Sequence, residues 1–108
     1  MARVYVGIGS NIEPERNICS GLASLRRRFG PLSTSTVYAN AAVGFAGDDF
    51  LNLVAGFQTG LAVHAVLARL RKIEEAHQHR GEGPKLAPRA LDLDLLLYDD
   101  LVLREDGL

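Results

Sequence analysis

Residues 88–98 read Pro88-Arg89-Ala90-Leu91-Asp92-Leu93-Asp94-Leu95-Leu96-Leu97-Tyr98, an apolar run that contains two carboxylates two positions apart. Alternate residues of a β-strand share one face of the sheet. We therefore expect Asp92 and Asp94 to project side by side, with Leu96 and Tyr98 continuing their face. The opposite face, which is expected to anchor the strand in a core, carries Leu91, Leu93, Leu95 and Leu97.

The carboxylate pair has two interpretations. Carboxylate oxygens suit Mg²⁺, which keeps several waters and completes its coordination with substrate phosphates. Asp92 and Asp94 therefore predict a metal site for phosphoryl transfer. Alternatively, the alternation is an ordinary half-buried strand in which both aspartates face water. Because aspartate is disfavoured inside strands, two of them in one strand call for a reason.

Length and composition limit the class of protein. A chain of 108 residues fits one domain, residues 1–108, and its 47% apolar and 23% charged residues are typical of soluble globular proteins. The net charge of −1, with no basic cluster beside aromatics, gives no sign of nucleic-acid binding. The sequence offers no membrane-spanning run or signal peptide, and its single cysteine cannot form an internal disulfide. We expect a cytoplasmic protein with no membrane partner.

Hydrophobic periodicity predicts the order of elements along the chain. Period-two alternation indicates strands at residues 3–8 and 50–59 and in the aspartate run. A segment rich in Ser, Thr and Val indicates a further strand at 32–39, and residues 101–103 could form a short last strand. Helical spacing indicates helices at residues 14–28 and 63–77, with loops at 40–49 and 78–87. The order β-α-β-β-α-β is that of the α+β ferredoxin-like fold, an antiparallel sheet with two helices on one face.

The loop before the aspartate run is rich in cations, namely His77, His79, Arg80, Lys85 and Arg89. Cations beside a carboxylate-bound metal would neutralise the phosphates of ATP during transfer. The alternative is a solvated loop in which Arg89 only pairs with an aspartate. The spacing of His77 and His79 could also suit zinc, but no third ligand is evident from the sequence.

Two further polar residues are candidates for substrate binding. Glu74, close to the end of the second predicted helix, could accept hydrogen bonds from an adenosine or from the cationic loop, or be an exposed helix carboxylate. Asn52 is an amide within an apolar strand, which suits recognition of a heterocycle edge or a structural hydrogen bond.

Four motifs follow one another along the chain, Tyr5-Val6-Gly7-Ile8-Gly9-Ser10-Asn11, Phe50-Leu51-Asn52, Ile73-Glu74 and Pro88-Arg89-Ala90-Leu91-Asp92-Leu93-Asp94-Leu95. Together they resemble those of the bacterial 6-hydroxymethyl-7,8-dihydropterin pyrophosphokinases. The resemblance covers essentially the whole chain. It implies a ferredoxin-like fold and an enzyme of folate biosynthesis that transfers pyrophosphate from ATP to the pterin hydroxymethyl group, giving AMP.

The resemblance also implies roles for the charged residues. Asp92 and Asp94 would hold two Mg²⁺ ions that bridge the ATP phosphates. Arg89 would contact the nucleotide or its phosphates, and Arg80 and Lys85 would be the loop cations. In-line attack on the β-phosphorus would then depend on positioning and metal electrostatics.

The substrate-binding residues implied by the resemblance are Glu74 for the nucleotide and Asn52 for the pterin ring. Gly9 in the first motif and Val43 in the loop after the second strand would also belong to the binding site. That loop, Asn40-Ala41-Ala42-Val43-Gly44, lacks the proline of the family pattern. Residues 78–81 and 85–87 likewise replace the family's arginine- and tryptophan-bearing loop elements.

Family members usually continue beyond a position equivalent to Leu108, through a segment that closes over the pterin. We therefore expect residues 1–108 to supply the core and the metal pair but not every wall of the pterin pocket. The alternative to a pyrophosphokinase is a catalytically impaired relative that binds pterin, nucleotide or a protein partner. An unpaired strand edge near residues 32–39, or around the C-terminus, also predicts a homo-oligomer in which a second copy supplies the missing wall.

Overall fold

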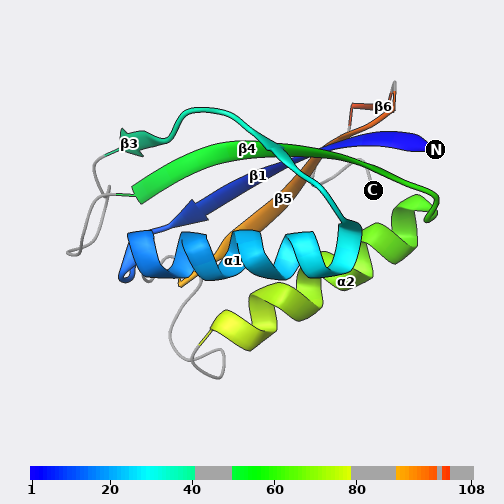
Figure 1. The fold of residues 1–108 in the computed structure, drawn as a ribbon. Coiled ribbons are helices and arrows are strands. Elements are labelled where there is room, and N and C mark those ends of the chain that lie inside the picture. Colours follow the sequence, from blue (N-terminus) through cyan, green and yellow to red (C-terminus); the bar gives the residue numbers. More distant parts are fainter. Residues whose placement is uncertain (41–49, 79–89, 100, 103–108) are drawn as a thin grey trace.

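The computed structural model describes residues 1–40, 50–78, 90–99 and 101–102. Figure 1 shows an antiparallel sheet with both helices of the described residues packed on one face. This arrangement confirms the predicted α+β ferredoxin-like fold. The elements in chain order are β1 (Ala2–Ser10), α1 (Pro14–Phe29), β2 (Ser33–Thr34), β3 (Tyr38–Asn40), β4 (Phe50–Thr59), α2 (Val63–His77), β5 (Asp92–Tyr98) and β6 (Leu101–Val102).

The sheet is built around β1, the central strand. The strand order is β2-β4-β1-β5-β6. Strand β3 pairs with the same edge of β4 as β2 does, but nearer the start of β4. All of these pairings are antiparallel. Strand β1 pairs with β4 along its whole length and with β5 from Val4 to Gly9, so residues from β4 and β5 meet across the middle of one sheet.

The core lies between the sheet and the two helices. Alternate residues of β1 turn towards the helices, which is the period expected of a strand with one covered face. The rings of Phe29 at the end of α1 and Phe57 in β4 stack there with centroids 4.3 Å apart. The buried side chains come from every long element and include Val4, Val6, Ile8, Ile18, Leu25, Leu53, Phe57, Val66, Leu70, Ile73, Leu91, Leu93 and Leu95.

The boundaries of α1 lie at residues that start and stop helices. Helix α1 begins at Pro14, where a missing N–H costs no helical hydrogen bond. It ends at Phe29 and is capped by Gly30, which has a φ of 90° and donates its N–H to the carbonyl of Arg26. The turn before the helix is closed by the Asn17 amide, which donates to the carbonyl of Ile12.

The predicted second strand, residues 32–39, is corrected to two short strands. Thr34 and Tyr38 are four residues apart, whereas their pairing partners in β4, Ala55 and Asn52, are three residues apart. The extra residue interrupts the ladder as a β-bulge does. Ser35 bridges the interruption, because its Oγ accepts a hydrogen bond from Val54 N and its own N–H donates to Val54 O.

A second irregularity corrects the predicted faces of β5. The β1 register runs from Tyr5 opposite Leu97 to Val6 opposite Leu95, so that Leu96 is an extra residue. Beyond this bulge the alternation is inverted. Leu97 takes the register of the aspartate face, although it was expected in the core, and Tyr98, expected beside the aspartates, packs against the core.

Tyr98 is anchored in its unexpected position by a hydrogen bond, because its hydroxyl donates to the carbonyl of Leu61 at 2.7 Å. Leu96 lies on the uncovered face next to Gly7 and is 38% exposed.

No helix within the described residues is long and apolar enough to span a membrane.

Candidate functional site

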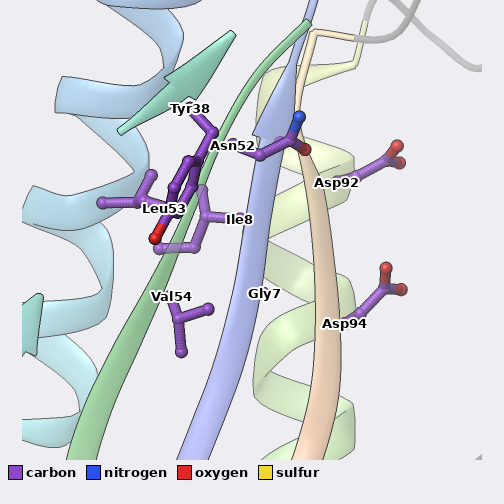
Figure 2. Close-up of a pocket in the computed structure, with 9 residues that line it drawn as sticks. Gly7, Ile8, Tyr38, Asn52, Leu53, Val54, Asp92 and Asp94 are labelled. Carbon is purple, nitrogen blue, oxygen red and sulfur yellow. The ribbon is translucent and has the colours of Figure 1, made fainter. Parts of the chain in front are cut away.

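The face of the sheet that the helices leave uncovered carries the two aspartates. In the ladder between β1 and β5, Asp92 pairs with Gly9 and Asp94 pairs with Gly7. Paired residues of an antiparallel ladder point to the same side of the sheet. Figure 2 shows both carboxylates projecting from β5 in the same direction, as the sequence predicts. Asp92 is half-buried and Asp94 is exposed.

Asn52 reaches the same place from the other side of β1. It pairs with Gly9, which also pairs with Asp92, so the three residues form one row across β4, β1 and β5. A Cβ atom at Gly9 would lie only 2.8 Å from Oδ1 of Asn52. The absence of a side chain at Gly9 therefore lets the amide of Asn52 lie over the central strand.

The row continues onto β3, because Tyr38 pairs with Asn52. Its side chain is 58% exposed. A second row is formed by Val54, Gly7 and Asp94. The two rows border an open cavity of about 230 Å³. Among the described residues it is lined by Gly7, Ile8, Gly9, Tyr38, Asn52, Leu53, Val54, Asp92 and Asp94 (Figure 2).

The structure brings four of the predicted site residues together, namely Gly9, Asn52, Asp92 and Asp94. Glu74 lies elsewhere, on the helical side of β5. Its Oε2 accepts a hydrogen bond from the backbone N–H of Leu93 at 2.7 Å. Glu74 thus contacts the backbone between the two aspartates, and its predicted contact with a nucleotide stays a prediction.

The other predicted site residues, Val43, Arg80, Lys85 and Arg89, lie outside the described residues. His79 of the possible zinc pair lies there as well. His77 connects the two helices, with its Nε2 2.8 Å from Ser20 Oγ and its Nδ1 2.8 Å from the carbonyl of Ile73.

Sequence reasoning missed Tyr38, Gly7 and Val54 as parts of the cavity wall. A local signal existed for two of them, because Gly7 stands two positions before Gly9 and Val54 two positions after Asn52, on the same strand faces. Tyr38 carried no such signal, because its alignment with Asn52 depends on the extra residue between β2 and β3.

The donor set fits a hard divalent cation such as Mg²⁺. Mg²⁺ is commonly held by one or two carboxylates together with substrate phosphates and water. Asp92 and Asp94 provide such a pair, opposite Gly9 and Gly7 of β1. Among the described residues no group of three or more His, Cys, Asp or Glu side chains could hold a metal ion.

A sequence model of the 7,8-dihydro-6-hydroxymethylpterin-pyrophosphokinases matches residues 5–106. The chain belongs to this pyrophosphokinase family. The match includes the strands that carry Gly9, Asn52 and the two aspartates, so the cavity lies within the part of the chain that identifies the family.

Curated relatives named 2-amino-4-hydroxy-6-hydroxymethyldihydropteridine pyrophosphokinase are similar along most of the chain. The Aquifex aeolicus protein is 37% identical over 106 residues, which cover 96% of this chain and 66% of that protein. The Campylobacter jejuni protein is 41% identical over 104 residues, covering 93% and 66%. The Pseudomonas putida protein is 33% identical over 109 residues, covering 98% and 90%. The chain thus spans 66% of the length of the first two relatives.

Proposed function

We propose that this chain transfers pyrophosphate from ATP to 6-hydroxymethyl-7,8-dihydropterin in folate biosynthesis, with AMP as the second product. Membership of the pyrophosphokinase family supports the proposal, as do the names of the relatives. The observation that carries it is that an amide and two carboxylates open into one cavity. Asn52 comes from β4 and the two aspartates from β5, and the sheet register brings them together across β1.

The proposed roles follow from the chemistry of these groups. The Asn52 amide offers both a donor and an acceptor to the edge of a pterin ring. Asp92 and Asp94 would hold Mg²⁺, with two ions expected. When bound, such ions neutralise charge on the phosphates and orient them for in-line displacement. Arg80, Lys85 and Arg89 remain proposed partners of the phosphates.

In the reaction proposed, the hydroxymethyl oxygen of the pterin bonds to the β-phosphorus of ATP. The bond from that phosphorus to the oxygen bridging to the α-phosphorus breaks, AMP leaves, and the hydroxyl proton passes to solvent. The protein contributes mainly by alignment, since holding two reactants in register can supply about 7–11 kcal/mol of the barrier. The row from Asn52 to Asp92 gives this alignment a rigid base, because both residues pair with Gly9 in the sheet.

The test is AMP release from ATP and Mg²⁺, measured with and without the pterin. Asp92→Asn and Asp94→Asn are each expected to lower the pterin-dependent rate about 100-fold or more. Glu75→Gln removes an exposed carboxylate from α2 and serves as the matched control with an unchanged rate. If the folded wild-type chain binds the pterin but releases no AMP, the proposal fails and a binding module is the better reading.

Three broader expectations also stand as proposals. A single domain at residues 1–108 would show one cooperative unfolding transition. A homo-oligomer that completes the pterin pocket would elute above the monomer mass and lose activity on dilution. A cytoplasmic location would be tested by cell fractionation.

A further inference from the structure

Within the part of the chain that the structure describes, the edge of β5 that faces away from β1 is paired only at its end distant from the aspartates. Strand β6, among the described residues, pairs only with Leu97 and Tyr98. The backbone at residues 90–93 therefore lies beyond the reach of that pairing. Backbone donors and acceptors at such a position require other partners when the surrounding side chains are buried. Ala90, Leu91 and Leu93 are all buried, so this requirement applies to them.

Two side chains at the C-terminal end of α2, one in its last turn and one at its C-cap, supply these partners. Glu74 Oε2 accepts from Leu93 N at 2.7 Å. Gln78 uses both ends of its amide, with Oε1 accepting from Ala90 N at 3.2 Å and Nε2 donating to the carbonyl of Leu91. Because residues four apart share a face of a helix, Glu74 and Gln78 present their polar groups to the strand together.

Gln78 is itself fixed by the helix that carries it. It is the C-cap residue of α2, and its backbone N–H donates to the carbonyl of Glu74 at 2.9 Å. His77, one position earlier, contacts Ser20 of α1. The end of α2 is therefore attached both to α1 and to β5. Figure 1 shows this end of α2 on the helical side of the sheet, so these contacts do not occupy the uncovered face.

We infer that Glu74 and Gln78 are positioning residues for the aspartate pair. Together they replace a neighbouring strand along residues 90–93 and fix the backbone on both sides of Asp92. The orientation of the two carboxylates, and with it the affinity of the site for a divalent cation, then depends on side chains that lie on the other side of the sheet. The inference rests on the proposed function of Asp92 and Asp94 as the metal pair.

The contact geometry makes separate predictions for each residue. Gln78→Ala should release the backbone of Ala90 and Leu91, whereas Glu74→Ala should release Leu93. Glu74→Gln retains an oxygen acceptor and should keep Leu93 N–H bonded. Loss of a group that orients a metal ligand typically weakens metal binding about 10- to 100-fold. Substitution of Glu75, which is exposed on the same helical turn, should neither release these backbone groups nor weaken metal binding.

The experiment combines amide hydrogen exchange by NMR with a Mn²⁺ titration of the full chain, without nucleotide. In Gln78→Ala we expect faster exchange at Ala90, unchanged exchange at the buried core residues Val6 and Phe57, and about tenfold weaker Mn²⁺ binding. In Glu74→Ala the same loss should appear with faster exchange at Leu93, and Glu74→Gln should restore protection there. Glu75→Gln is the matched control.

Unchanged exchange at Ala90 and unchanged Mn²⁺ affinity in a folded Gln78→Ala variant would overturn the inference. Faster exchange throughout the core would do the same, since it would indicate general destabilisation. These outcomes are separable from failure of the proposed function. A wild-type chain that binds Mn²⁺ but forms no AMP would refute the transfer reaction, and the comparison between variants and wild type would still decide whether Gln78 positions the metal pair.

Discussion

Gly9 and Asn52 are so closely apposed that a Cβ atom on the glycine would approach the amide oxygen of Asn52 to 2.8 Å. Gly9→Ala should therefore displace the amide from its place over β1. Because the displaced atom ends a side chain, the cost to folding should be small, whereas recognition of the pterin should suffer. We expect KM for the pterin to rise at least about tenfold, as measured by steady-state AMP release.

Gly60→Ala is the matched control for Gly9→Ala. A Cβ atom there meets nothing within 4 Å, and Gly60 follows β4 outside the described lining of the cavity. We expect unchanged kinetics. An equal rise in KM for both variants would show that the amide of Asn52 is not the affected group.

Asp94→Asn should separate activity from stability. The side chain is exposed on the sheet face, and asparagine has nearly the same shape. Substitutions of this kind usually change the free energy of unfolding by less than about 0.5 kcal/mol. We expect urea denaturation of Asp94→Asn to give nearly the wild-type free energy of unfolding, while AMP release is lost. A large loss of stability would instead assign Asp94 a structural role.

Tyr38→Ala should weaken pterin binding without unfolding the protein. Tyr38 lines the cavity from β3, where its ring can stack on a flat heterocycle. Stacking of this kind contributes about 1–3 kcal/mol, so the pterin Kd should rise about tenfold in isothermal titration calorimetry. Val37→Ala changes a neighbour that is 53% exposed and should leave Kd unchanged.

Tyr98→Phe should lower stability and spare the site. The substitution removes the hydrogen bond from the Tyr98 hydroxyl to the Leu61 carbonyl and leaves the ring in place. A lost hydrogen bond of this type costs about 1 kcal/mol. We expect that decrease in the free energy of unfolding, with AMP release unchanged under native conditions. A stability equal to that of the wild type would show that water replaces the hydroxyl as the partner of Leu61.

Local sequence patterns were sufficient for the long elements. The predicted strand at residues 50–59 coincides with β4, and the helix predicted at 63–77 coincides with α2. In both segments the apolar period is uninterrupted and the ends carry turn residues or helix signals. The β-α-β-β-α-β order then limited the topology to few alternatives, because connections between neighbouring elements are short.

The two bulges could not be predicted, for different physical reasons. Leu95, Leu96 and Leu97 are chemically identical, so hydrophobicity cannot show where the alternation shifts by one residue. At Ser35 the side-chain hydroxyl replaces a backbone partner, which composition does not reveal. Both features are set by contacts with a strand distant in sequence.

The site was predictable only in part for a related reason. Asp92 and Asp94 stand out because carboxylates are unusual in an apolar strand. Their neighbours are set by registers that join residues far apart in sequence, such as Gly9 with Asn52 and with Asp92. The contact of Gln78 with residues 90 and 91 is equally non-local, and the sequence indicated only a polar loop there.

The extra residue at Leu96 also determines what could be transplanted into another protein. Odd-numbered residues of β5 turn towards the helices up to Leu95, and the even-numbered Tyr98 does so afterwards. If the same residues were placed on a regular antiparallel strand without the bulge at Leu96, the carboxylates would keep their face. Tyr98 would then turn towards solvent and lose its anchor. The seven residues Asp92–Tyr98 are therefore the segment that carries the carboxylates, the extra residue and the tyrosine anchor together.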